Sequence, residues 1–262
     1  MNTVRPLALF AFLSILAASC QPALARDRIA FYCGRGGSAG VCVMDSDGSN
    51  QAKLTDESLE AVGAPSWSPD GSSIAFAAAS NGERAEIYVI SADGSQSKRL
   101  TDDDNDDADP VWSPDGRYIA FSSLMNEDFE VFIIRPDGTG RLNLSRSPGT
   151  DIVPAWSPDS TRVAFYSTRD ANGEIYAVDV DASGLINLTN SPVDDGQPVW
   201  SPNGSRIAFS AFIDKVPDVH IMSADGSGKK RLTPGAGAED IAWSPDGKLI
   251  AFVASAQANA DV

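Results

Sequence analysis

The chain has one histidine and three cysteines among 262 residues, and few basic residues. A single histidine excludes metal centres built from several imidazoles, including the common zinc ligand sets that need them. Lys and Arg number 20 against 36 Asp and Glu, a net charge of −16. That balance disfavours nucleic acid and anionic lipid as partners. No window after the N-terminus has the pattern of an amphipathic helix, so an all-β fold is predicted.

The one long apolar run, residues 7–18, follows Arg5. This pattern predicts a secretory signal peptide over residues 1–25 and no transmembrane span. Two processing sites compete. The stretch 23–25 is an A-x-A site, while Cys20 ends a lipoprotein-like box in which Ala17 replaces the usual Leu. Soluble release, lipidation at Cys20 and an uncleaved anchor stay open. Soluble release predicts a periplasmic or secreted protein. Lipidation at Cys20 predicts a lipoprotein attached to a membrane.

Cleavage after residue 25 removes only Arg5 from the charge count, leaving 19 basic and 36 acidic residues, a net charge of −17. Such a surface favours cationic partners, metal ions or neutral surfaces. The plainer alternative is that the acidic side chains serve solubility.

A tryptophan turn recurs along the chain and uses every tryptophan in it. The tryptophans are spaced by 45, 44, 44 and 43 residues: Trp67, Trp112, Trp156, Trp200 and Trp243. Each is followed by Ser-Pro and then Asp-Gly, Asp-Ser or Asn-Gly, a tight-turn sequence. A period near forty residues with short strands predicts a β-propeller. We expect a single propeller domain over residues 26–262.

Each repeat predicts a four-stranded blade. An Ile-Ala-Phe or Val-Ala-Phe strand follows each Trp turn, then an apolar third strand and a short Leu-Thr or Leu-Ser strand. The first unit lacks the Trp strand, and the last ends after its second strand. We therefore expect the N- and C-terminal strands to close the ring in one sheet. The sequence has five Trp strands but six Ile-Ala-Phe or Val-Ala-Phe strands. A propeller of five to six blades is therefore predicted.

The repeated pattern Pro-x-Trp-Ser-Pro-Asp-Gly-x-x-Ile-Ala-Phe resembles the TolB-type, WD40-like propeller repeat. The resemblance spans about residues 26–255 and implies a periplasmic protein, usually with six blades. TolB contacts a peptidoglycan-associated lipoprotein and other Tol components, partly through an N-terminal α/β domain for which this chain has no counterpart. The same repeat accompanies peptidase domains in prolyl-oligopeptidase-like enzymes.

The resemblance implies a non-enzymatic platform for an envelope protein or peptide, which we expect to be a monomer. No catalytic constellation is recognisable. The alternative is a propeller enzyme, a carboxylate- or metal-assisted hydrolase or lyase acting on a saccharide, lactone or peptide. The motif Gly36–Gly40 has the G-x-S-x-G spacing of a serine nucleophile, but it lies in a hairpin rather than a strand–helix elbow. His220 aligns with third-strand aromatics, so we expect it to pack.

Acidic residues precede several Trp strands. Rotation of the repeats predicts an arc of carboxylates at the tunnel mouth, with these candidate binding residues: Asp107, Asp151, Asp195 and Asp240. They would bind a basic peptide, an amine or a hard cation, or else cap their own turns. The acidic run 102–109 lacks a calcium-loop pattern and predicts an exposed loop. No cofactor and no metal ligands are predicted, with Ca²⁺ as the open alternative.

Cys33 and Cys42 remain after processing, at the end of one strand and inside the next. A cross-hairpin disulfide and two buried thiols are both compatible with this spacing.

Overall fold

The computed structural model describes residues 28–34, 39–80 and 82–254. The predicted signal peptide, Cys20 and residues 36–38 of the glycine-rich motif lie outside the described residues.

Twenty-one strands form six antiparallel sheets in this part of the chain. Sheet 1 contains β1 (Arg28–Cys33), β2 (Gly40–Asp45) and β3 (Ala52–Lys53). Sheet 2 contains β4 (Leu59–Trp67), β5 (Ser73–Ser80), β6 (Ala85–Ser91) and β7 (Ser97–Arg99). Sheet 3 contains β8 (Asp107–Trp112), β9 (Ile119–Met125), β10 (Asp128–Ile134) and β11 (Leu142–Asn143).

Sheet 4 contains β12 (Asp151–Trp156), β13 (Arg162–Ser167), β14 (Glu174–Asp179) and β15 (Ile186–Asn187). Sheet 5 contains β16 (Asp195–Trp200), β17 (Arg206–Ile213), β18 (Val216–Ser223) and β19 (Lys230–Arg231). Sheet 6 contains β20 (Ala238–Trp243) and β21 (Ile250–Ala254).

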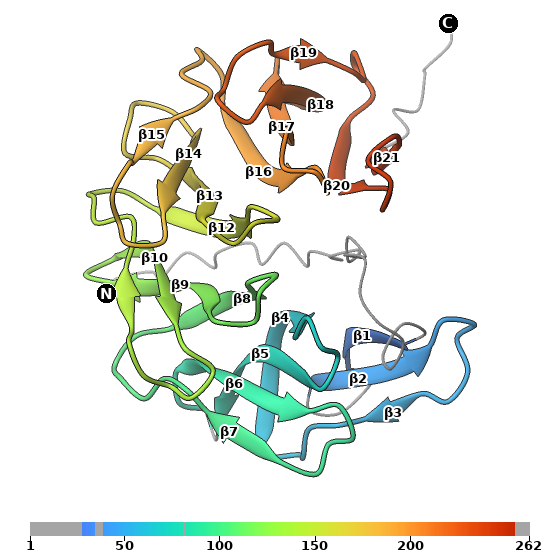
Figure 1. Cartoon of the computed structure of the whole chain (residues 1–262). Coiled ribbons are helices and arrows are strands. Elements are labelled where there is room, and N and C mark those ends of the chain that lie inside the picture. The colour runs from blue at the N-terminus through green and yellow to red at the C-terminus, as the bar shows by residue number, and fades with distance from the viewer. Residues whose placement is uncertain (1–27, 35–38, 81, 255–262) are drawn as a thin grey trace, which may run out of the picture.

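The sheets are arranged radially, which confirms the predicted β-propeller (Figure 1). The Trp strands β4, β8, β12, β16 and β20, called here the inner strands, lie nearest the axis and each pairs on one side only. The third strand of one sheet packs against the inner strand of the next: β6 on β8, β10 on β12, β14 on β16 and β18 on β20. Each such contact between neighbouring sheets is called a seam. A seam is named below by the residue that begins its inner strand, for example the Asp107 seam between β6 and β8.

The tight turns form because their polar side chains satisfy the backbone. In the first of them the Ser68 hydroxyl donates to Asp70 at 2.7 Å and accepts the Ser73 amide at 2.9 Å. Gly71 has φ of 70°, a left-handed conformation that glycine adopts without steric cost. The turns fix the spacing between inner and second strands.

The core repeats from sheet to sheet. In sheets 2 to 5 the second-strand phenylalanines are at most 1% exposed: Phe76, Phe121, Phe165 and Phe209. Each stacks on a third-strand ring, and in sheet 5 that ring is His220, 5.5 Å from Phe209. The predicted packing role of His220 is therefore confirmed.

Tryptophans span the seams unequally. The Trp156 indole donates to the Val111 carbonyl of the preceding sheet at 2.9 Å, and Trp243 donates likewise to Val199 at 3.1 Å. The indole N–H groups of Trp67, Trp112 and Trp200 are buried without a hydrogen-bond partner. The shared sequence position thus yields two different hydrogen-bonding states.

Each inner strand carries a β-bulge and extends further toward its N-terminal end than the short Trp strand that the sequence predicts. The register of each with its neighbour shifts near the middle of the strand. One residue in every bulge has positive φ: Gly63, Asp109, Val153, Gln197 and Asp240. These are called the bulge residues below.

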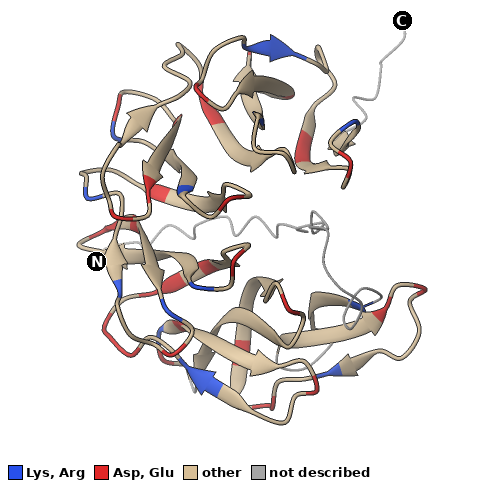
Figure 2. Cartoon of the chain, in the orientation of Figure 1, with Lys and Arg blue, Asp and Glu red and all other residues tan. Residues whose placement is uncertain are grey.

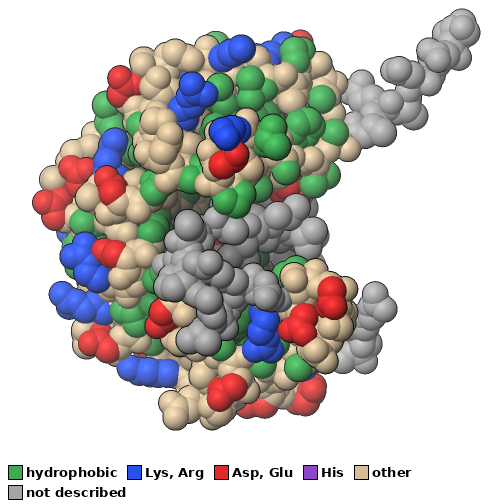
Figure 3. Space-filling model, turned by 45° about the vertical axis from the view of Figure 1, so that its right-hand side comes forward, with side chains coloured by type: hydrophobic (Ala, Val, Ile, Leu, Met, Phe, Trp, Pro, Cys, Tyr) green, Lys and Arg blue, Asp and Glu red, His purple; other side chains and the backbone are tan. Residues whose placement is uncertain are grey.

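Among the described residues β1 and β21 belong to separate sheets, so sharing of one blade by the two termini stays a prediction. Large apolar side chains are exposed near these edges: Ile29, Tyr32, Leu249, Phe252 and Val253. Hydrophobic side chains appear on this side of the molecule in Figure 3. Closure of the ring would bury such groups.

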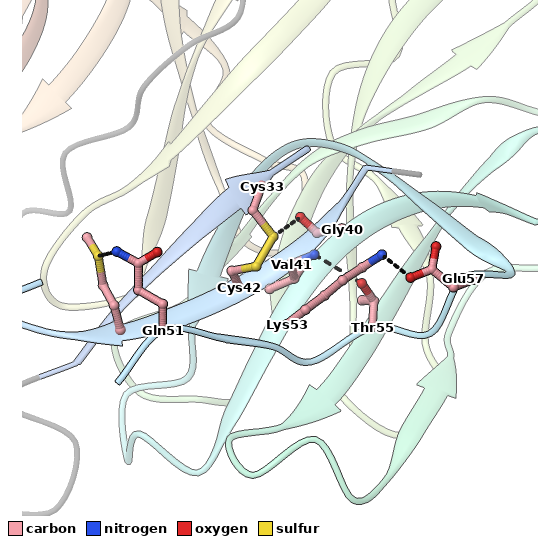
Figure 4. The surroundings of a disulfide bond; sticks show 9 residues. Cys33, Gly40, Val41, Cys42, Gln51, Lys53, Thr55 and Glu57 are labelled. Carbon is pink, nitrogen blue, oxygen red and sulfur yellow. Dashed lines mark hydrogen bonds and ion pairs between the residues drawn. A yellow bond between two sulfur atoms is a disulfide. The ribbon is translucent and has the colours of Figure 1, made fainter. Parts of the chain in front are cut away.

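Cys33 and Cys42 form a disulfide between β1 and β2, with Cα atoms 5.8 Å apart (Figure 4). Of the two states that the sequence left open, the structure contains the bonded one.

Candidate functional site: carboxylates in the seams

A carboxylate opens or nearly opens the third strand in four sheets: Glu86, Glu130, Glu174 and Asp218. Because third strands pack on the next inner strand, the first three of these groups face the acids that begin inner strands, and Asp218 faces Ala238. The three inner-strand acids are Asp107, Asp151 and Asp195. The sequence analysis did not identify the third-strand acids as site residues. The pattern that could have revealed them is an acid directly before Ile-Tyr, Val-Phe or Val-His in successive repeats.

Hydroxyl groups connect each seam to the backbone. Ser145 Oγ accepts the Val131 amide at 2.9 Å and donates to Glu130 at 2.6 Å. Thr189 bonds in the same way to the Ile175 amide and to Glu174. In these two seams the Leu-Ser or Leu-Thr hydroxyl therefore holds the third-strand carboxylate in place.

The predicted inner-strand acids are buried rather than displayed at a tunnel mouth. Asp107, Asp151 and Asp195 are 0, 0 and 2% exposed. Figure 2 shows acidic residues along the inner strands. Asp240 has a different place, since it is a bulge residue equivalent to Asp109 and partly exposed. The four candidates therefore do not form one arc, and their role as ligand-binding residues stays a prediction.

In the Asp151 seam a guanidinium balances the acids. Arg169 Nη2 donates to Asp151 Oδ2 at 3.0 Å, and Ser147 Oγ donates to the same oxygen at 3.1 Å. The guanidinium lies over Phe165 and Tyr176, 5.5 and 4.5 Å from their centroids. Stacking and ion pairing together fix this cation.

In the Asp107 seam the corresponding guanidinium comes from a different position in the repeat. Arg141 lies over Phe121 and Phe132, at 5.4 and 4.4 Å. It bonds Asp103 and Ser123, but its nearest nitrogen is 3.8 Å from Asp107. Both Asp107 oxygens, Glu86 Oε2 and Arg141 Nε are buried without hydrogen-bond partners.

Burial raises the pKa of Asp107 to about 6; the nearby hydroxyls of Ser123 and Thr101 oppose the rise, and the Glu86 charge adds to it. Burial likewise raises the pKa of Asp195 to about 6, with a contribution from Glu174.

In the remaining seams the acids are fewer. Arg231 Nε donates to Asp218 at 2.8 Å opposite Ala238, and Gly40 and Ala61 supply no carboxylate between sheets 1 and 2.

The acidic run 102–109 is only partly the exposed loop that was predicted. The Asp102 side chain is 86% exposed and Asp104 is exposed, but the Asp103 side chain is 29% exposed and Asp107 is buried. The run folds back onto Glu86 because the Asp103 amide donates to Glu86 at 3.3 Å.

The bulge residues lie on the axis-facing strands. A Cβ added to Gly63 would meet Asp109 Oδ1 at 3.9 Å, so bulges of neighbouring sheets approach each other. Burial raises the pKa of both Asp109 and Asp240. Val153 has φ of 57°, which is strained for a β-branched residue.

A depression of about 440 Å³ lies at the opposite end of the inner strands, between the turns of sheets 4 and 5. Asp159, Arg162 and Trp200 line it. It does not include any seam carboxylate.

The fold and the inner-strand arrangement define this protein as a β-propeller. A model of the TolB β-propeller domain family matches residues 26–141 and 110–262. The chain belongs to that family. No curated protein matches the sequence.

Solved structures show the same fold. TolB from Acinetobacter baumannii is 22% identical with a TM-score of 0.71, covering 88% of this chain and 58% of that chain. A putative TolB from Agrobacterium tumefaciens is 22% identical with a TM-score of 0.68, covering 86% and 87%. An oligogalacturonate lyase in complex with manganese is 12% identical with a TM-score of 0.70, covering 87% and 71%.

The chain therefore spans little more than half of the first TolB chain. Because the neighbours include both TolB proteins and a lyase, the fold alone does not separate a platform from an enzyme. No helix in the described part of the chain has the length and apolar character that crossing a membrane requires.

Proposed function

We propose that the protein is a non-enzymatic platform of the cell envelope that binds an envelope protein or peptide at the inner strands. The observation that carries the proposal is the row of bulge residues. All five inner strands bend at equivalent positions, and four of the five residues there are not glycine. Strained backbone of this kind concentrates at functional sites.

The inner strands also have one edge free of strand partners among the described residues. Such edges offer backbone N–H and C=O groups to an extended peptide. The bulge side chains differ from sheet to sheet while the framework repeats, which supports a surface selected for contact rather than for packing. The acids Asp109 and Asp240 suit a partner with Lys or Arg.

The test is recovery of partners from envelope extracts with purified protein as bait. A variant with Asp109→Asn and Asp240→Asn should lose its specific partner. The matched control, Asp137→Asn with Asp225→Asn, removes two exposed acids from outer hairpins and should keep it. Equal recovery by both variants would contradict the proposal. Circular dichroism checks that both variants are folded.

The predicted location supports the same proposal. The disulfide between Cys33 and Cys42 suits an oxidising compartment. Release by an A-x-A site and lipidation at Cys20 differ in mass, so mass spectrometry of the mature chain separates them.

A further inference from the structure

The Asp107 seam contains a group of oxygens without balancing partners. Glu86, Asp103 and Asp107 each direct a carboxylate oxygen to a region in which these atoms lie within 4.8 Å of one another. Glu86 is 2% exposed and Asp107 is 0% exposed. Glu86 Oε2 and both Asp107 oxygens have no hydrogen-bond partner. A buried carboxylate without partners is costly, so the seam calls for a cation.

The protein's own cations leave that need unmet. Arg99 Nη2 binds the other Glu86 oxygen at 2.6 Å, and also Asp102 at 2.8 Å. Arg141 bonds Asp103 but reaches no closer than 3.8 Å to Asp107. In the neighbouring seam Arg169 contacts Asp151 directly, at 3.0 Å.

We propose that the Asp107 seam is a binding site for a hard divalent cation, Ca²⁺, held by Glu86, Asp103 and Asp107. Ca²⁺ takes carboxylate oxygens at about 2.3–2.6 Å, so opposed ligands stand about 5 Å apart, which matches the spread of these oxygens. Water molecules complete the shell on the solvent side, where the Asp103 side chain is 29% exposed.

Arg141 is the internal competitor for this ion. Its guanidinium bonds Asp103 and Ser123 and lies over Phe132, so the ion has to displace the contact between Arg141 and Asp103 when it enters. Three carboxylates with Arg99 alone carry a formal charge of −2, which one divalent ion neutralises. Removal of the Arg141 charge should therefore strengthen ion binding.

The test is calorimetric titration of the EDTA-treated, dialysed full chain with CaCl₂. We expect one ion per chain with a Kd of about 0.1–1 mM, the range of extracellular calcium modules. Asp103→Asn should weaken binding at least tenfold. The Asn side chain can still accept the Asn105 amide, which Asp103 bonds at 2.9 Å, so the loop keeps its local contact.

Two further variants make the result specific. Asp104→Asn removes an exposed neighbouring acid outside the group and should leave the Kd unchanged. Arg141→Gln should lower the Kd several-fold. MgCl₂ should bind more weakly, because Mg²⁺ demands shorter octahedral bonds and sheds water reluctantly. The proposal would be overturned if no binding is seen at CaCl₂ concentrations up to about 10 mM, ten times the upper end of the expected Kd range. It would also be overturned if Asp103→Asn and Asp104→Asn change the Kd equally. The titration needs no partner, so its outcome is independent of the platform proposal.

Discussion

The Asp107 and Asp151 seams contain the same pair of acids at equivalent positions, yet they are balanced differently. Arg169 lies two residues after the end of β13, and its Nη2 is 3.0 Å from Asp151 Oδ2. Arg141 approaches from the hairpin before β11, occupies the same place over two aromatic rings, and is drawn to Asp103 instead. The comparison shows that a repeat can conserve the position of a cation while changing which carboxylate it neutralises.

The difference has an energetic consequence. A buried ion pair contributes little net stability, but a buried charge deprived of its partner is strongly destabilising. The Asp151 seam should therefore suffer from any loss of its cation. The Asp107 seam already lacks a close partner, so it should respond weakly to the same change and favourably to removal of the acid.

The largest effect is expected for Arg169→Met. It leaves Asp151 buried without its cation and should cost about 3–5 kcal/mol in the free energy of unfolding. Arg141→Met should cost about 1 kcal/mol, because its guanidinium is more exposed and further from the inner-strand acid. Urea unfolding measures both. Equal losses would show that the seams are balanced alike.

A smaller difference is expected at the hydroxyl bridges. Ser145→Ala removes the donor to Glu130 and the acceptor for the Val131 amide, and should cost about 2 kcal/mol. Thr101→Val removes the acceptor for the Ile87 amide at 2.9 Å and a hydroxyl beside Asp107, but no hydrogen bond to Glu86, and should cost about 1 kcal/mol. A larger loss for Thr101→Val would mean that its hydroxyl also holds Glu86. The midpoint of urea unfolding separates the two outcomes.

The smallest contrast concerns the indoles at the two seams. Trp156→Phe and Trp112→Phe remove similar volume, but only the first breaks a hydrogen bond, to Val111. Trp156→Phe should therefore be worse by about 1 kcal/mol. Trp156→Ala, which also leaves a cavity, should cost about 3–5 kcal/mol in total. Thermal unfolding of the Phe pair tests the contrast, and identical midpoints would count against it.

Much of the fold could be predicted because the repeat is explicit. Trp156 and its equivalents fixed the period, and Pro158 with its neighbours fixed the turns. The bulges could not be predicted, since Val153 has no sequence feature that announces a left-handed backbone. Closure was inferred from incomplete end units; among the described residues β1 and β21 lie in separate sheets, so a blade shared by the two termini stays a prediction.

The candidate site could be predicted only in part. The periodic acids Asp107, Asp151 and Asp195 were visible, but their burial depends on a neighbouring sheet that folds over them. Glu86 and its equivalents lie at or near the starts of third strands, where an acid in the sequence is most simply interpreted as an exposed strand end. Arg141 and Arg169 lie over equivalent aromatic rings of their own sheets, although they come from different positions in the repeat. Aligning the repeats by their period therefore does not pair them.

The most direct test of unequal balance is the free energy of unfolding of Asp107→Asn and Asp151→Asn against the parent chain in EDTA, at pH 7 and pH 4. Folding raises the pKa of Asp107 from its ordinary 3.8 to about 6, so the folded state holds that proton more tightly than the unfolded state does. Its contribution to stability is present below about pH 4 and is lost as pH rises through 6. Asp107→Asn should therefore gain about 1–3 kcal/mol over the parent at pH 7 and little at pH 4. Asp151→Asn should lose stability at pH 7, because it leaves Arg169 buried without its carboxylate. Losses of equal size for both variants at pH 7 would contradict the account.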